Sequence, residues 1–469
     1  MPLVLLVAGL LLGGARPAPA QLADAGPAYY FLLGRYHESN GQIEEAVAAY
    51  TRAIALAPGS AELHAELAGL YARQDQPLDA VVAAEQALSL DPDNREANRI
   101  IGTIYAALAE QRRPLRPGED PARYVARAIA AFERVRQGGP SDIGLEFTLG
   151  RLYLQSGAPQ QAVPLLRRVA SEQPGSADVA ILLASAEEAS GDTAAAIETL
   201  RSALDRNPRS FRGFVLLAEL SEKQAAWSQA ADAYARAQQL SSRGADLTPR
   251  RAAALLNAGQ PGTARELLQP QAEGAEAPPV LLYLYAVAQR QSGDLDGAEA
   301  TARRLRTAAP DDPRGLYVLA QVLESRGDAP GAERALRDLL DRHPADATAL
   351  NYLGYMFAER GEHLDEAVSL VQRALAIEPG NPAFLDSLGW AYFQQGHLDL
   401  ADSPLTEAAE KMPGNSVIQD HLGDLRFRQQ RFAEAAEAWE RSLAGDGESI
   451  DRARIEKKIR DARVQMDVR

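Results

Sequence analysis

The sequence contains no cysteine. Disulfide bonds, thiol nucleophiles and cysteine-ligated metal sites are therefore excluded, and so is an N-terminal lipidated cysteine. Aromatic residues make up only 6% of the 469 residues, whereas hydrophobic residues reach 46% and charged residues 24%, as in an ordinary folded protein. Residues that favour helices dominate, so the composition predicts an all-α protein. A chain of this length is too long for one globular core.

The sequence also lacks the motifs of several enzyme classes. None of the six histidines occurs at a metal-binding spacing, and no glycine-rich phosphate loop or nucleophile elbow is present. The net charge of −15 argues against nucleic acid as the main partner, because phosphate binding requires a basic surface. We therefore interpret the chain as a non-enzyme that uses no metal and no cofactor.

Residues 1–20 have the pattern of a secretory signal. The apolar run over residues 3–12 is too short to span a bilayer. Ala18 and Ala20 fit a small-x-small cleavage site, which predicts cleavage after Ala20 and a connector at residues 21–26. No Lys or Arg precedes the apolar run, so an uncleaved anchor or a start codon placed too far downstream are the alternatives. We favour export to a bacterial periplasm or secretion.

From residue 27 onward the sequence repeats every 34 residues, as Pro379 and Pro413 show most clearly. A fixed period of this size indicates a repeat array. Repeats 1–6 cover residues 27–244, repeat 7 covers residues 245–278, and repeats 8–12 cover residues 279–449. The tail at 450–469 is charged but amphipathic, so we expect a helix that caps the last hydrophobic face, with a partner-docking helix as the alternative.

Small residues recur at fixed positions of the repeat, counted from its first residue. Position 20 is alanine in all twelve repeats: Ala46, Ala80, Ala128, Ala162, Ala196, Ala230, Ala264, Ala298, Ala332, Ala367, Ala401 and Ala435. Position 8 is always Gly or Ala, and we expect it to face position 20 so that two helices, A and B, approach closely. Gly at position 15 allows the turn between them, and Pro at position 32 ends helix B in nine repeats.

This pattern resembles the tetratricopeptide repeat, W-x2-L-G-x2-Y…A-x3-F…P. Repeat 11 carries it as Leu385, Leu388, Gly389, Tyr392, Ala401, Leu405 and Pro413. The resemblance implies an all-α α-solenoid of about twelve helix-turn-helix units, wound as a right-handed superhelix whose concave wall is lined by the A helices. It further implies a non-catalytic scaffold that binds proteins or peptides in that groove. The last segments also look like those of exported bacterial repeat proteins. The alternative function is a structural component of a cell-envelope export or assembly system, such as polysaccharide secretion.

Two repeats depart from the frame. Repeat 3 has an insertion near residues 112–124 that carries several arginines, and Asp120 followed by Pro121 predicts a helix start there. A tolerated loop is the favoured interpretation, and contact with an anionic surface or partner is the alternative. Repeat 7 lacks its terminal proline and has Pro249 early in helix A, so we predict a hinge or local irregularity near residues 245–279.

Positions 2, 5, 9 and 12 of helix A point away from the packed face. In the C-terminal half they predict a peptide-binding groove, whose residues are Tyr283, Tyr317, Gln321, Asn351, Tyr355, Asp386, Trp390, Asp420 and Asp424. In the N-terminal half only Phe31, Arg35, Phe147 and Arg151 stand out.

The aromatics would anchor an extended basic and apolar segment, and the aspartates would supply the complementary charge. Phe393 and Phe427 lie at the same positions, but packing against the next repeat is an equally good interpretation of these two rings. The groove lacks the two basic residues and two asparagines with which chaperone-tail-binding members of the family hold acidic C-terminal tails, so capture of such a tail is not expected.

Overall fold

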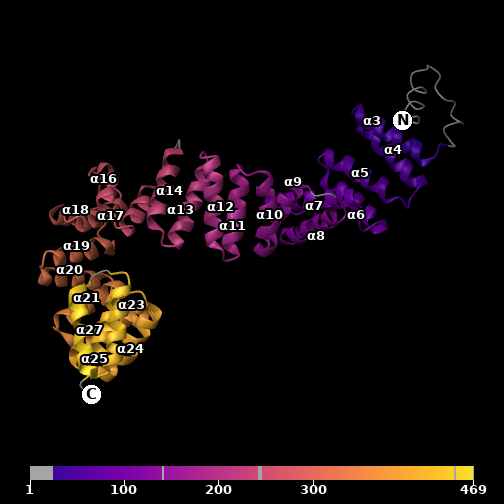
Figure 1. Ribbon diagram of the computed structural model, residues 1–469. Coiled ribbons are helices and arrows are strands. Elements are labelled where there is room, and N and C mark those ends of the chain that lie inside the picture. The colour runs from indigo at the N-terminus through magenta and orange to yellow at the C-terminus, as the bar shows by residue number, and fades with distance from the viewer. Residues whose placement is uncertain (1–24, 140–141, 241–245, 448–449, 468–469) are drawn as a thin grey trace. The chain divides into compact units, whose positions relative to one another are not determined.

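The computed structural model describes residues 25–139, 142–240, 246–447 and 450–467. Within these ranges the chain forms twenty-five α-helices, α3–α27, one 3-10 helix, η1, and no strand (Figure 1). The predicted all-α solenoid of helix pairs is therefore confirmed. The predicted signal and nearly all of the connector lie outside the described residues. No helix in the described ranges is both long and apolar enough to cross a membrane.

The chain divides into two compact units, Met1–Ala245 and Asp246–Arg469. The first unit contains six helix pairs, each forming one repeat. The pairs are α3 (Pro27–Ser39) with α4 (Ile43–Leu56), α5 (Ala61–Arg73) with α6 (Pro77–Leu90), α7 (Arg95–Gln111) with α8 (Tyr124–Gln137), α9 (Ile143–Gln155) with α10 (Pro159–Glu172), α11 (Ala177–Ala189) with α12 (Thr193–Arg206), and α13 (Phe211–Lys223) with α14 (Trp227–Leu240).

The second unit contains six further pairs and a single terminal helix. The pairs are α15 (Thr248–Asn257) with α16 (Pro261–Ala272), α17 (Pro279–Gln291) with α18 (Leu295–Ala308), α19 (Pro313–Ser325) with α20 (Ala329–Arg342), α21 (Ala347–Arg360) with α22 (Leu364–Ile377), α23 (Pro382–Gln395) with α24 (Leu398–Lys411), and α25 (Ser416–Arg428) with α26 (Phe432–Ala444). The terminal helix is α27 (Arg452–Asp467).

The alanines at position 20 are the most uniformly buried residues of the fold. All twelve are 0% exposed. The side chain nearest to position 8 is the larger one at position 24, and in repeat 10 a Cβ on Gly354 would also lie 3.1 Å from the carbonyl oxygen of Ala367 at position 20, as expected. A Cβ placed on Gly150 would lie 2.5 Å from Cγ of Leu166, and one on Gly389 would lie 2.5 Å from Cγ of Leu405. Glycine at position 8 is thus explained by a large side chain of helix B that fills the space beside it.

The turn between the A and B helices has a left-handed residue at position 15. All eight glycines predicted there have positive φ angles, from 65° to 95°. In three other repeats the same position is occupied by Asp75, Ala225 and Gln430, whose φ angles are 55°, 52° and 61°. The backbone geometry of the turn is therefore kept even where a side chain disfavours it.

The two irregular repeats have defined structures. In repeat 3, the Tyr124 hydroxyl accepts a hydrogen bond from the Leu115 amide at 2.7 Å and donates one to Glu119 at 2.6 Å, which fastens the inserted loop to the start of α8. Asp120 caps η1 (Pro121–Arg123) by accepting from the Ala122 amide at 3.0 Å. In repeat 7, α15 has 10 residues, whereas α13 and α17 have 13 each.

Helix α27 packs on α26 through an apolar face. Ile455, Ile459 and Ala462 are buried and contact the cluster that contains Trp439, whereas Met466 is 46% exposed. The opposite face of α27 carries charged, exposed residues. The last repeat therefore ends on a polar surface, as the end of a solenoid requires for solubility.

Candidate binding surface on the A helices

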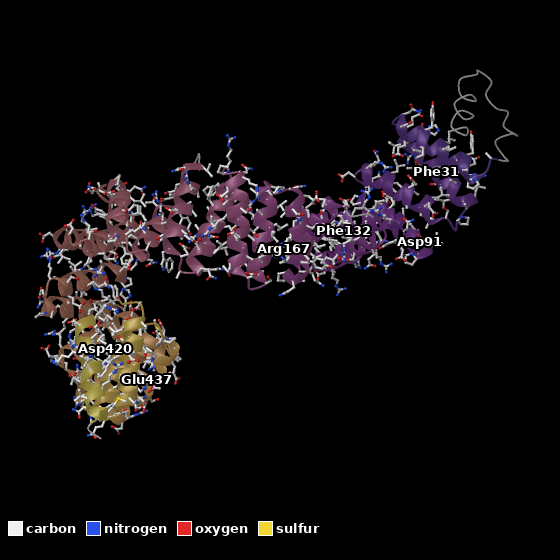
Figure 2. All side chains as sticks on the ribbon, viewed as in Figure 1. Phe31, Asp91, Phe132, Arg167, Asp420 and Glu437 are labelled. Carbon is white, nitrogen blue, oxygen red and sulfur yellow. The ribbon has the colours of Figure 1, made fainter. Side chains whose placement is uncertain are left out.

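The predicted binding residues lie on one face of five consecutive A helices, α17, α19, α21, α23 and α25. We call this face the A-helix wall; it consists of the nine predicted residues and the side chains that contact them. Seven of the nine are partly exposed, whereas Asp386 and Trp390 are only 5% and 8% exposed. Asp420 marks the position of α25 in Figure 2, and Glu437 that of α26 in the same repeat.

Tyrosines connect repeats 8, 9 and 10 along the wall. Arg314, whose guanidinium is held by Asp312, lies over the Tyr283 ring at 5.5 Å. The Tyr317 and Tyr352 rings are 5.4 Å apart, and Gln321 lies near the Tyr317 hydroxyl. One contact to Tyr283 and one ring pair therefore link the A helices of the three repeats.

Two glutamates accept hydrogen bonds from aromatic side chains of repeats 10 and 11. Glu324 on α19 accepts one from the Tyr352 hydroxyl. Glu359 on α21 accepts one from Nε1 of Trp390 at 3.1 Å, and the Tyr355 hydroxyl lies near the same carboxylate. Burial raises the pKa values of both tyrosines, and the carboxylate beside each raises them further. Both hydroxyls therefore stay protonated, and that of Tyr352 is the donor to Glu324.

The Trp390 ring is held by stacking in repeats 11 and 12. It stacks on Phe393 with a centroid distance of 4.8 Å and on His421 with a distance of 4.0 Å. Nδ1 of His421 lies 2.9 and 3.0 Å from the two Asp386 oxygens, and both residues are buried. Burial by itself lowers the pKa of His421, but the Asp386 carboxylate outweighs it, so the pKa lies above its ordinary value. Asp386 is thus a buried ion-pair partner.

The last two predicted aspartates also have an internal partner. Nζ of Lys458, on α27, lies 2.7 Å from an oxygen of Asp420 and 2.7 Å from an oxygen of Asp424. Burial and the nearby Asp420 charge raise the pKa of Asp424, although Lys458 opposes them. The three predicted aspartates are therefore compensated within the chain by His421 and Lys458.

The remaining predicted residues differ in their surroundings. The side-chain oxygen of Asn351 is buried and accepts no hydrogen bond from the described part of the chain. Phe427 contacts Phe432 and Trp439 of its own repeat, and Phe393 lies between Trp390 and Arg428. The two phenylalanines are therefore packing residues as much as surface residues.

Sequence reasoning missed several residues of this surface. Arg314, Tyr352, Glu359, His421 and Lys458 contact predicted residues directly, and Glu324 is linked to them through Tyr352. Glu324 occupies position 12 of repeat 9, so the periodic pattern contained the signal for it. Tyr352 and His421 lie at position 6 and Glu359 at position 13, next to the positions considered, and Lys458 lies outside the repeats.

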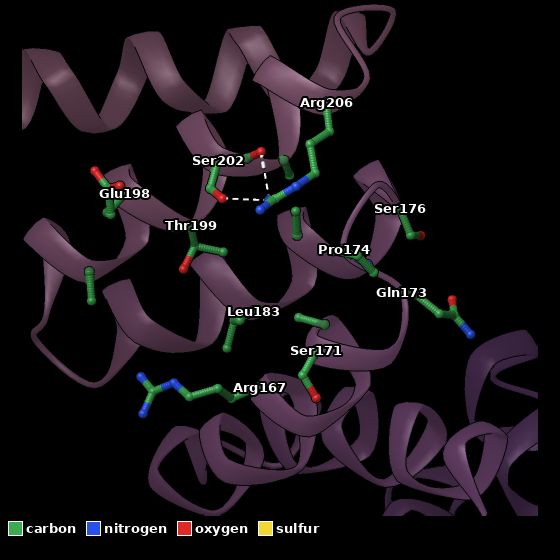
Figure 3. A pocket seen from close by; sticks show the side chains of 14 residues that line it. Arg167, Ser171, Gln173, Pro174, Ser176, Leu183, Glu198, Thr199, Ser202 and Arg206 are labelled. Atoms are coloured by element: carbon green, nitrogen blue, oxygen red, sulfur yellow. Dashed lines mark hydrogen bonds between the residues drawn. The ribbon is translucent and has the colours of Figure 1, made fainter.

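Open clefts also occur in the described part of the chain, between the B helices of consecutive repeats. The cavity of about 580 Å³ between α10 and α12 is lined by Arg167, Ser171 and Thr199, and Arg206 donates to Ser202 at its edge (Figure 3). Equivalent cavities of about 610 and 350 Å³ occur between repeats 8 and 9 and between repeats 2 and 3. Because the same cleft recurs along the array, it follows from repeat packing and indicates no particular ligand. Within the described ranges no cluster of His, Asp and Glu suits a metal ion.

Comparisons with known proteins agree with the repeat frame. Family models described as tetratricopeptide repeat match residues 27–60, 125–186, 153–220, 255–322 and 317–382, which together are more than half of the chain. A search of the curated proteins found no match.

Solved structures similar to the chain share little sequence with it. Yeast Tom70 is 14% identical, with a TM-score of 0.49 and coverage of 94% of this chain and 96% of that one. Cut9 in the APC/C hetero-tetramer Cut9-Hcn1 is 13% identical, with a TM-score of 0.43 and coverage of 96% and 92%. YrrB, described as a TPR protein with an unusual peptide-binding site, is 17% identical, with a TM-score of 0.36 and coverage of 42% and 93%.

Proposed function

Because this chain belongs to the tetratricopeptide-repeat family, we propose that it is a non-catalytic scaffold that binds polypeptide segments along the A-helix wall of repeats 8–12. The observation that carries this proposal is the series of side-chain contacts that link each A helix to the next, from Tyr283 on α17 to Lys458 on α27. Partly exposed aromatic rings are typical of surfaces that bind proteins.

The partner that suits this wall is an extended segment with basic and apolar side chains. Apolar groups of the segment would cover the partly exposed rings of Tyr283, Tyr317 and Tyr355. Covering such rings contributes binding energy because apolar area leaves water. The wall carries more carboxylates than cations, which favours a basic segment and disfavours an acidic one.

Site-specific photocrosslinking tests the proposal. A photoreactive amino acid at Ala383, which is exposed at position 2 of α23, is expected to crosslink a polypeptide in cells that make the protein. The same amino acid at Arg334, exposed on the B helix α20, is the matched control and is expected to give no such product. Crosslinks of equal yield at both positions, or none at Ala383, would contradict the proposal.

We also propose that the scaffold is exported and cleaved after Ala20, on the basis of the N-terminal sequence pattern. Mass spectrometry of the mature protein from its natural cells is expected to begin at Gln21. Export is likewise required by the alternative function, a structural component of envelope export or assembly. Stable co-fractionation with membranes in the absence of a crosslinked polypeptide would favour that alternative over a peptide-binding scaffold.

A further inference from the structure

Positions 3 and 10 of helix A face the B helix of the preceding repeat. At position 3 of repeat 9, a Cβ added to Gly315 would lie 3.0 Å from Cγ of Arg306 on α18. At the same position of repeat 6, a Cβ added to Gly213 would lie 3.0 Å from a methyl carbon of Leu204 on α12. In α27, counted in the same frame, position 10 is Ile459, which belongs to one buried cluster with residues of α26. Each B helix therefore covers one stripe of the A helix that follows it.

Repeat 1 leaves this stripe open. Position 3 is buried in repeats 2–6 and 8–12, and position 10 is buried in repeats 2 and 4–12. In the part of the chain that the structure describes, α3 is the first helix and no B helix precedes it (Figure 1). Its Tyr29 at position 3 and Leu32 at position 6 are partly exposed, and Tyr36 at position 10 is 44% exposed. We call these three residues the α3 stripe.

The α3 stripe carries no charge, because both charged residues of α3 form ion pairs with repeat 2. Nη1 of Arg35 lies 3.2 Å from an oxygen of Glu66. The Arg73 guanidinium lies 2.5 Å from an oxygen of Glu38. The chain as a whole has a net charge of −15, so two copies repel one another over most of their surface. An uncharged apolar stripe is therefore a place where two copies can approach each other without bringing like charges together.

The α3 stripe is also complementary to itself. Tyr29, Leu32 and Tyr36 are spaced i, i+3 and i+7, which places them on one side of the helix. When two copies of α3 lie antiparallel about a two-fold axis beside Leu32, Tyr29 of each copy lies opposite Tyr36 of the other. The same surface then serves both copies, as an isologous contact requires. Tyrosine suits such a contact because its ring packs while its hydroxyl stays at the wet edge.

The last helix of the array does not offer an apolar surface to the α3 stripe. Helix α27 covers the last repeat with its apolar side, and its other side carries exposed charged residues such as Glu456, Lys457 and Arg460. Packing the α3 stripe on these residues would remove water from their charges without pairing them. Contact between α3 and α3 is therefore favoured over contact between α3 and α27, and it gives a closed dimer instead of a filament.

We propose that two copies of the chain associate through the α3 stripe, with Tyr29 and Tyr36 of one copy packed across a two-fold axis on Tyr36 and Tyr29 of the other. This contact lies on repeat 1 and is separate from the A-helix wall of repeats 8–12, so the dimer presents two walls. A single pair of helices buries less area than a standard interface, so the dissociation constant is expected to be on the order of micromolar or weaker.

Sedimentation velocity of the protein purified from cells that make it tests the proposal. The average mass is expected to rise from that of a monomer toward that of a dimer over about a hundredfold range of concentration. Tyr36→Glu buries a carboxylate in the contact and is expected to weaken association about tenfold or more. Leu400→Glu, at a position that is 49% exposed on α24, is the matched control and is expected to associate like the natural protein. Equal circular dichroism melts show that both variants are folded.

The absence of cysteine from the chain allows a direct test of the two-fold axis. The thiol of Leu32→Cys would lie opposite its own copy and is expected to form a disulfide-linked dimer on mild oxidation, whereas Leu400→Cys is expected to stay monomeric. A natural protein that stays monomeric at every concentration, with α3 covered by residues 1–20 or by another polypeptide, would overturn the proposal. Association that Tyr36→Glu leaves unchanged would overturn it too, as would equal disulfide yields from the two cysteine variants.

Discussion

In the first unit, A-helix residues on the side of positions 9 and 12 form ion pairs from one repeat to the next, whereas the A helices of the second unit carry contacting aromatic rings. The ion pairs are Arg35–Glu66, Glu38–Arg73, Glu110–Arg151 and Glu188–Lys223. They link consecutive repeats and are partly or fully exposed, so each contributes about 0–1 kcal/mol to stability. The second unit has Tyr317, Tyr352, Tyr355 and Trp390 instead.

This difference shows which positions of the repeat keep the same residue type and structure in both units and which positions vary in chemistry. The buried alanine at position 20 is the same in both units, as is the turn at position 15. The wall positions lie outside the contact between helices A and B, so their chemistry changes without altering the fold. In the first unit the wall charges compensate one another, whereas in the second Glu324 and Glu359 remain uncompensated by any described ion pair.

Replacing the residue at position 9 is expected to give the largest difference in stability loss between the two units. Trp390→Ala removes a ring that stacks on Phe393 and His421 and should cost about 3–5 kcal/mol of stability. Arg151→Ala, at the same position in repeat 4, removes an exposed ion pair and should cost less than about 1 kcal/mol. Urea unfolding followed by circular dichroism measures both, and equal losses would contradict the comparison.

Adding a side chain at position 8 is expected to destabilise both units to a similar extent, because helices A and B pack in the same way in both. Gly150→Ala and Gly389→Ala each place a Cβ 2.5 Å from a leucine side chain, and each should cost roughly 1–3 kcal/mol. Gly69→Ala is the control, since its Cβ would meet only the flexible end of Arg73, and it should stabilise α5 by about 0.5–1 kcal/mol. Thermal unfolding of the three variants provides the measurement. A loss in only one unit would show that the scaffolds differ.

The buried His421–Asp386 pair should make only the second unit sensitive to pH near neutrality. The pKa of His421 is raised in the folded protein. The contribution of the pair to stability is therefore complete below the unfolded pKa of about 6.5 and declines as the pH rises through the folded pKa. Each unit by which the folded pKa exceeds the unfolded one corresponds to about 1.4 kcal/mol. The groups around the ring are Asp386 and Trp390 on α23, Tyr355 and Glu359 on α21, and Asp420 on its own helix.

Urea midpoints of the natural protein and of His421→Gln, measured from pH 6 to pH 8.5, test this dependence. The difference between the two proteins is expected to shrink as the pH rises. A difference that grows with pH would show that burial outweighs the Asp386 charge and that the pKa is lowered.

The fold was predictable because its determinants are periodic in sequence. The alanines at position 20 and the glycines at position 15 mark the helix contact and the turn, and the structure gives these positions the burial and the φ angles they require. The contact of position 8 with the large side chain at position 24 was not predicted, because the pattern shows which residues are small but not which side chain fills the space beside them.

The wall was predictable only in part. Periodicity selects the residues that share a face, and it placed Tyr317, Tyr355 and Trp390 on the same side of consecutive A helices. It does not specify charge compensation, which depends on residues distant in sequence. Asp420 and Asp424 are paired with Lys458 from α27, and Asp386 with His421 from the next repeat, so the open acidic charge lies at Glu324 and Glu359 instead.

The smallest predicted effect concerns the turn, where the two units again share one geometry. Ala225 has a φ of 52°, a conformation that costs a residue with a Cβ about 1–2 kcal/mol. Ala225→Gly removes this strain but adds backbone entropy to the unfolded chain, so a net gain of about 0.5 kcal/mol is expected. Gly327→Ala, at the same position in repeat 9, should cost about 1 kcal/mol. Opposite shifts in melting temperature for the two variants follow if the left-handed turn is imposed by the packing of helices A and B. Shifts of the same sign would mean that the turn relaxes to suit whichever residue occupies it.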